Sequence, residues 1–347
     1  MDLAAVMGVD PVEAARAMYQ AISAGIAPAK VLKFLETNAK LAVGGVTDLE
    51  TAVDLTTTVL NAFGLETSET ARVADILFKG VEKGKTTIAE LGASLFQVAP
   101  TASAAGIPIE QVTAAMAALT AGGFPTAQAA TALRAGFIEL GKEGTKVNTA
   151  FQEVAGIGFR EFIAQGGTVV DVMALLAQKA EQDGVAVSDL FGSMEAGVAM
   201  GFLAVDLFDK LQDSLDATTN SAGAHEKAFD KMNATFGRQV TILKTELKVA
   251  LIKLGTALMP VARMMVKALR VVMKIINQMV EAFAALPKPI QIGIIAFFAL
   301  AAALGPVLVI VGTLLVAMGA FVALMPFISV ALIWLAVGFA AVILPIL

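Results

Sequence analysis

Apolar residues recur every three or four positions along most of the chain, and glycines and prolines interrupt them at short intervals. This pattern is typical of short amphipathic helices joined by tight turns. Within Ala71–Gly141, turns are predicted at Lys83–Lys85, Gly106–Pro108 and Gly122–Pro125. The alternation of β-branched and polar residues that marks strands is nearly absent. The pattern predicts an all-α fold that begins with stacked short helical hairpins.

The longest periodic segment lies in the second half of the chain. Its thirteen apolar positions follow one another at intervals of three or four residues, which average close to the helical period of about 3.6. They are Val240, Leu243, Leu247, Leu251, Leu254, Leu258, Val261, Met265, Leu269, Val272, Ile276, Met279 and Phe283. The opposite face carries Lys244, Lys248, Lys253, Arg263, Lys267, Arg270 and Lys274. We therefore expect a long basic amphipathic helix, kinked or split at Pro260, that packs in a bundle or lies on anionic lipid.

No charged residue follows Lys288. Ile290–Leu304 is short for a membrane span, whereas Val307–Met325 and Phe327–Leu347 are each long enough to cross a hydrocarbon core, which takes about 20 residues. A buried core helix is a poor explanation for three consecutive apolar segments without a polar face. The sequence predicts hydrophobic helices of the transmembrane type, with Gly312 and Ala317 as small surfaces for helix contacts.

Composition changes along the chain in step with these patterns. Hydrophobic residues make up 57% and charged residues 16%, which is too apolar for an ordinary soluble protein. Residues 1–237 carry a net charge of −12 and residues 238–288 a net charge of +7. Asp216–Gly223 is small and polar, as linkers are. The predicted parts are a helical core domain (1–216), a linker (217–223), a long basic amphipathic helix (224–286) and hydrophobic membrane-type helices (287–347).

One helical unit recurs weakly. Gly8–Gly25 matches Gly106–Gly123 and Gly184–Gly201, with a methionine at the same place in each. The first copy begins with Asp10-Pro11, a capping residue followed by proline at the first helical position. The recurrence indicates one hairpin element used three times, with chance similarity among alanine-rich helices as the alternative.

Residues that carry chemistry are few and poorly spaced. Gly80–Thr86 has three residues between its glycines where a P-loop needs four, and it follows a helical pattern rather than a strand. His225-Glu226 begins like a zinc-protease helix, but Phe229 stands where the second histidine belongs. The chain has one histidine and no cysteine. The sequence therefore predicts no catalytic, cofactor or metal site and no enzyme.

An acidic stripe at helical spacing lies before the linker. Its members are Asp206, Asp209, Asp213 and Asp216. A contact with cations or a basic partner is one interpretation, but no glycine-containing calcium loop accompanies them. A solvated helix face is the simpler expectation.

Several short motifs follow one another along the chain. They are Asn61–Leu65, Arg72–Asp75, Glu90–Gly92, Val98–Pro100, Ala104–Ile107, Gln128–Arg134, Leu254–Pro260 and Leu304–Pro306. With these motifs the chain resembles the helical domain of phage tail tape measure proteins, whose length sets the length of the tail. Order and spacing agree over about 80 residues, and the resemblance covers most of the chain up to about Gly319. The resemblance implies a structural protein of the virion, and the basic helix then fits a bundle with neighbouring copies inside the tail tube. It also implies that the hydrophobic segments help the genome to cross the host membrane.

The resemblance further implies a set of partners and locations. We expect self-association in a helical bundle and contacts with the tail tube protein, tail assembly chaperones and baseplate or tail-tip proteins. Host membrane lipid is expected on ejection, and sequence-specific nucleic acid is not. The locations are the virion tail lumen, the host membrane during infection, and membranes when the chain is expressed alone. The alternative is a free-standing phage or prophage membrane pore, similar to a holin. Met1 is expected to be an internal or alternative start, and Leu347 the end of a truncated reading frame.

Overall fold

The computed structural model describes residues 2–343. Over this range it contains sixteen α-helices, two short 3-10 helices and no strand, which confirms the all-α prediction. The chain divides into two compact units, Met1–Thr256 and Ala257–Leu347, and each is described by itself.

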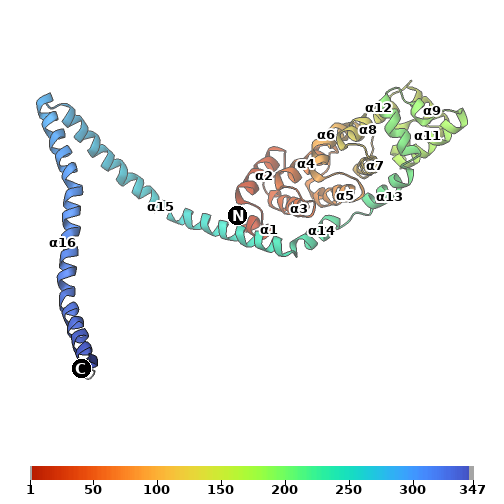
Figure 1. The fold of residues 1–347 in the computed structure, drawn as a ribbon. Helices are drawn as coiled ribbons and strands as arrows, with labels where there is room; N and C mark the ends of the chain where they lie inside the picture. Colours follow the sequence, from red (N-terminus) through yellow and green to blue (C-terminus); the bar gives the residue numbers. More distant parts are fainter. Residues whose placement is uncertain (1, 344–347) are drawn as a thin grey trace. The chain divides into compact units, whose positions relative to one another are not determined.

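The first unit contains fourteen short helices and the first turns of α15 (Figure 1). The short helices are α1 (Asp2–Met7), α2 (Pro11–Ser23), α3 (Val31–Gly44), α4 (Leu49–Ala62), α5 (Thr70–Lys83), α6 (Ile88–Ala104), α7 (Ile109–Ala121), α8 (Thr126–Gly141), α9 (Lys146–Ala155), α10 (Phe159–Ala164), α11 (Val169–Asp183), α12 (Met194–Ala204), α13 (Phe208–Thr219) and α14 (Ala224–Asn233), with 3-10 helices η1 (Thr67–Glu69) and η2 (Val187–Leu190) between them.

These helices stack as hairpins in two rows. In one row α2 packs on α4, α4 on α6, α6 on α8 and α8 on α12, and in the other α3 packs on α5 and α5 on α7. Alanines at the contacts, among them Ala52, Ala99 and Ala129, are fully buried and let the helices approach closely. One continuous hydrophobic core runs through both rows. The prediction of stacked short helical hairpins is confirmed, and we call α2–α8 the hairpin stack.

Local signals in the sequence place the helix ends. Asp10 caps α2 by accepting a hydrogen bond from the Val12 N–H, with Pro11 at the first helical position as predicted. Thr168 and Asp171 form a reciprocal capping box at the start of α11. Because Asp, Ser and Thr side chains satisfy the free N–H groups of a first turn, these positions define where helices start.

Two of the three predicted copies of the helical unit have the same local structure. Gly8 and Gly106 have positive φ angles of 56° and 79°, α2 and α7 each have 13 residues, and Gly25 and Gly123 both have φ of 101°. The prediction of a third copy at Gly184–Gly201 is wrong. After Gly184 the chain enters η2 rather than a long helix, and Gly201 lies inside α12 against the backbone of Ser188, where it permits close packing instead of ending a helix.

The segment after α12 turns back along the second row. Helix α13 packs on α7 and α5, and α14 packs on α5 and α3. The predicted linker is more ordered than expected, because α13 continues to Thr219 and Ser221 is buried. The predicted helix 224–286 is two helices, α14 and α15, separated at Thr235, whose hydroxyl accepts a hydrogen bond from the Arg238 N–H.

The second unit consists of the rest of α15 (Phe236–Ala284) and α16 (Lys288–Ile343). Pro260 does not split α15, which is helical on both sides of it. The three predicted apolar segments form a single helix, α16, as far as Ile343, and residues 344–347 lie outside the described residues. Among the described residues, α15 and residues 288–320 of α16 are the two helical segments long and apolar enough to cross a membrane, and almost none of their most apolar stretches is buried.

Candidate functional site: the apolar stripe of α15 and its anchor

The thirteen apolar residues predicted to share one face of α15 do so, and we call them the apolar stripe. Eleven are exposed and two, Val240 and Phe283, are half-buried. The exposed fraction is 64% at Leu243, 59% at Leu251 and 66% at Met279. A row of large apolar side chains this long is not left in water by a monomeric soluble protein. The stripe is therefore the main candidate for an interaction surface.

The opposite face of α15 anchors the helix to the start of the chain. Ile242 lies against Gly8, and Thr245 and Val249 on the same face are buried. The Arg238 guanidinium donates to the carbonyl oxygens of Met7 and, at 3.2 Å, Gly8. Since Arg238, Ile242, Thr245 and Val249 follow one another at intervals of three or four residues, they form one helix face. The anchor and the apolar stripe thus occupy opposite sides of the same helix.

An ion pair extends this anchor. Lys248 pairs with Asp10, the capping residue of α2. The Lys248 ammonium and the Val12 N–H both stabilise the carboxylate and hold the pKa of Asp10 below its usual value of 3.8. Further along, the anchor side of α15 becomes the basic face, with Arg263, Lys267 and Lys274.

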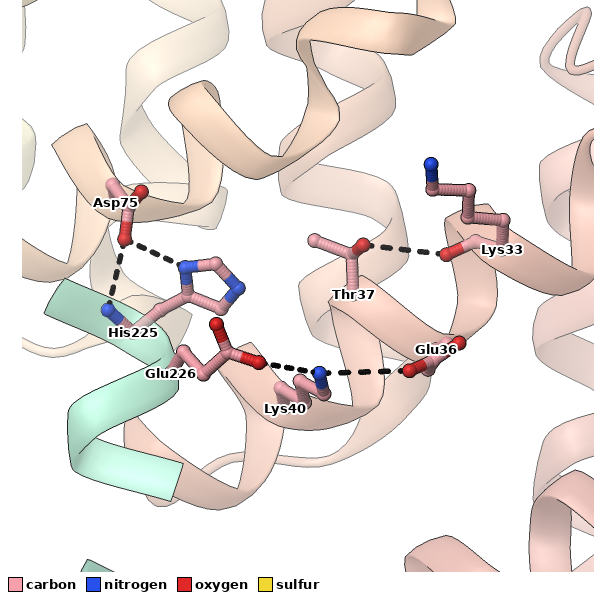
Figure 2. A network of polar contacts seen from close by, with 7 residues as sticks. All are labelled: Lys33, Glu36, Thr37, Lys40, Asp75, His225 and Glu226. Carbon is pink, nitrogen blue, oxygen red and sulfur yellow. Dashed lines mark hydrogen bonds and ion pairs between the residues drawn. The ribbon is translucent and has the colours of Figure 1, made fainter. Parts of the chain in front are cut away.

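A buried carboxylate holds α14 in place (Figure 2). Asp75 on α5 accepts hydrogen bonds from the Gly223 N–H at 2.9 Å and the His225 N–H at 3.0 Å, and its Oδ1 lies 2.7 Å from His225 Nδ1. Burial acts to raise the pKa of Asp75, but these hydrogen bonds outweigh it and the pKa lies below 3.8. Beside it, Lys40 on α3 bridges Glu226 at 2.8 Å and Glu36 at 3.5 Å.

Comparison with known proteins decides the family. The family described as phage-related minor tail protein matches residues 1–192, which contain the hairpin stack. The chain belongs to this family. It is a structural component of a phage tail, consistent with a location in the virion.

Two relatives of this tail protein carry more specific names. It is 37% identical over 258 residues, or 72% of its length, to the "Probable tape measure protein" of Clostridium phage phiCD119. It is 24% identical over 248 residues, or 69% of its length, to the "Tape measure protein" of Pneumococcus phage Dp-1. These matches cover 27% and 21% of the relatives, so the chain spans about a quarter of their length. No solved structure matches it.

The positions that superficially resemble chemical sites have structural roles in this tail protein. Gly80–Thr86 joins the end of α5 to α6, so no strand precedes it. A Cβ atom at Gly80 would overlap the Thr113 methyl group, and this close contact between α5 and α7 explains the glycine. Lys83 pairs with Asp213 at 2.7 Å.

The histidine and the acidic stripe are likewise accounted for by packing and surface contacts. His225 and Phe229 are both buried where α14 meets α3 and α5. Asp206, Asp209 and Asp216 are exposed, and Asp213 faces Lys83. Within residues 2–343, no three metal-binding side chains lie close enough together to hold an ion.

Sequence reasoning missed the contact between Asp75 and His225. The only signal was an acidic residue inside the otherwise apolar run Val73–Leu77, on a helix face that should be buried. The partner is 150 residues away, and a single sequence offers no spacing rule that joins the two.

Proposed function

We propose that the chain is a segment of a tail tape measure protein. Several copies lie in the lumen of the tail tube, associate through the apolar stripe of α15, and set tail length during assembly. Its apolar helix α16 helps the genome to pass the host membrane. Both relatives are named as tape measure proteins, one of them as a probable one, which supports this role.

The exposed apolar stripe is the structural observation that carries the proposal. A stripe spanning 44 residues can be removed from water by the same stripe on neighbouring copies, as in a helical bundle. Because its spacing is close to the natural helical period, the bundled helices need little supercoiling. Since the anchor side of α15 faces the turn between α1 and α2 of its own chain, self-association through the stripe leaves that contact intact.

The remaining partners follow from the same role. A scaffold inside the tube contacts the tail tube protein along its length, baseplate or tail-tip proteins at one end and tail assembly chaperones before assembly. Helix α16 carries no charge after Lys288, which suits host membrane lipid once the chain leaves the tube. The alternative is a free-standing phage membrane pore similar to a holin, and the exposed apolar surface of α16 is the observation that favours it.

Cross-linking in isolated tails tests the bundle. The chain has no cysteine, so single substitutions report one position each. Met265→Cys lies in the stripe, and Lys267→Cys lies two residues away on the opposite face. A short thiol-specific cross-linker should join copies at position 265 and leave position 267 largely unlinked. Equal linking at both positions, or none at either, would contradict association through the stripe.

A further inference from the structure

Residues 208–249, which comprise α13, α14 and the first turns of α15, run back along the hairpin stack, and we call them the strap (Figure 1). They contact the second row in reverse order. Helix α13 packs on α7 and α5, α14 on α5 and α3, and α15 touches the end of α1 through Arg238. The strap therefore begins at the far end of the stack and finishes beside the N-terminus.

Polar contacts anchor the strap at intervals. From its beginning to its end they are Lys83–Asp213, Thr218 Oγ1 to the Glu110 carbonyl, Asp75 to Gly223 and His225, Lys40–Glu226, Arg238 to the Met7 and Gly8 carbonyls, and Lys248–Asp10. They follow one another along the strap in chain order. A force that pulls α15 away from the stack therefore acts first on the contacts of Lys248 and Arg238. It reaches the other contacts only after these two have broken.

The strap buries few large apolar side chains for its length. Its buried side chains are Leu211, Ser214, Thr218, Ser221, Ala224, His225, Phe229, Thr245 and Val249. Five of these nine are polar, and three are large and apolar. By contrast, the single helix α6 buries Ile88, Leu91, Ser94, Leu95, Val98, Ala99 and Ala102 between two neighbours of its own row. Since the free energy of contact follows the apolar area buried, the strap separates at lower cost than a hairpin does.

Separation also leaves no charge stranded in the core. Asp75 lies on the side of α5 that the strap covers, and its partners Gly223 and His225 both belong to the strap. Figure 2 shows the two contacts with His225. When α14 leaves, the carboxylate, the imidazole and both backbone N–H groups become accessible to water together. The cost of an unpaired buried charge, which ordinarily makes such a contact hard to break, does not arise.

We propose that the strap detaches from an intact hairpin stack, in order from α15 through α14 to α13. It thereby converts a compact module into an extended arm without unfolding the hairpins. Detachment is a property of the chain by itself. Only the source of the pull, departure of the chain from the tail, rests on the proposed function.

Hydrogen exchange on the full chain in detergent micelles tests this directly. Amides of α14 and of the start of α15 should exchange in a separate opening step, faster than those of α4 and α6, with α13 in between. Asp75→Asn should speed exchange in α14 about tenfold or more, because hydrogen bonds to a charged group are lost, and leave α4 and α6 unchanged. The matched control is Asp54→Asn on the exposed surface of α4. Equal acceleration in all helices would overturn the proposal, because strap and stack would then open as one unit.

A staple gives the opposite perturbation and does not depend on weakening the fold. A Cβ at Gly44 would lie 3.1 Å from the Ala228 Cβ, so Gly44→Cys with Ala228→Cys places two thiols near disulfide distance after a small shift. Oxidation should slow exchange in α14, and reduction should restore it. Unchanged exchange in α14 after a confirmed disulfide would also overturn the proposal. Neither result depends on tail length, so failure of the strap and failure of the tape measure role are told apart.

Discussion

At the scale of single residues, Asp75 is the clearest case of a side chain whose surroundings set its behaviour. Its carboxylate accepts hydrogen bonds from two backbone N–H groups and lies against the His225 ring, and these partners all belong to the strap. These donors stabilise the charged form more than burial destabilises it, so the pKa of Asp75 is lowered in the folded chain. Lys40 and Glu226 lie close by but are partly or largely exposed, where an ion pair contributes little.

A pH dependence follows from the lowered pKa of Asp75. Because the pKa is lower in the folded than in the unfolded chain, the carboxylate stabilises the fold above pH 3.8, and this stabilisation is lost as pH falls below that value. Thermal unfolding of the full chain in detergent, followed by circular dichroism from pH 7 to pH 3, should show the decline. In Asp75→Asn the decline should be smaller and the melting temperature at pH 7 lower. Glu226→Gln should change both less, and a larger effect from Glu226→Gln would contradict this ranking.

Gly80 carries a second prediction at this scale. An alanine there would place its Cβ against the Thr113 methyl group, where α5 and α7 are in close contact. Since overpacking a tight contact costs about 1–3 kcal/mol, Gly80→Ala should lower the free energy of unfolding by that amount. Thr113→Ser removes the obstructing methyl group and should restore part of the loss in the double variant. Denaturant titration of the three variants measures this, and additive losses would show that the two positions do not meet.

At the scale of elements, the helices were predictable because their signals are local. Asp10, Thr87 and Thr168 cap helices at the places where apolar periodicity begins, and glycines such as Gly25 and Gly123 end them with positive φ angles. What could not be predicted depends on distant contacts. Nothing in the local sequence of Asp216–Gly223 shows that this segment packs on the stack. The Gly223 N–H donates a hydrogen bond to Asp75, which is 148 residues away in the chain. The same limit explains the third repeat, where packing against Ser188 decided the role of Gly201.

Helix α16 carries the prediction on membrane passage. An arginine at Ala317 would place a charge near the middle of Val307–Met325, at a cost of roughly 2.5–3.5 kcal/mol for insertion. In a phage that builds its tail with this chain, Ala317→Arg should give tails of normal length that deliver DNA poorly, while Ala317→Leu should behave normally. Infection and electron microscopy measure the two effects. Normal infectivity of the arginine variant would argue against membrane crossing by this segment, and failed assembly would show that it packs inside the tail during construction.

At the scale of the whole molecule, the two units differ in where their apolar side chains lie. The hairpin stack has a continuous core and buries its apolar side chains, whereas α15 and residues 288–320 of α16 expose theirs. Exposed apolar surfaces of this size are typical of interaction sites, as the proposed function requires. The resemblance to tape measure proteins was visible in short motifs such as Gln128–Arg134, and the family match over residues 1–192 bears it out. The strap and the anchor of α15 were not visible, because they join residues more than 100 positions apart.

Tail length is the most direct test of a ruler role for α15. Deleting 258–275 removes 18 residues, which is about five helical turns, so the apolar stripe keeps its direction on both sides of the deletion. A deletion of nine residues, 258–266, turns the remaining stripe to the opposite face and serves as the matched control. If α15 sets tail length, the 18-residue deletion gives completely assembled tails that are shorter by about 27 Å in electron micrographs, at about 1.5 Å per residue. The nine-residue deletion should disturb assembly. Tails of unchanged length from the 18-residue deletion would contradict the role of α15 as a ruler.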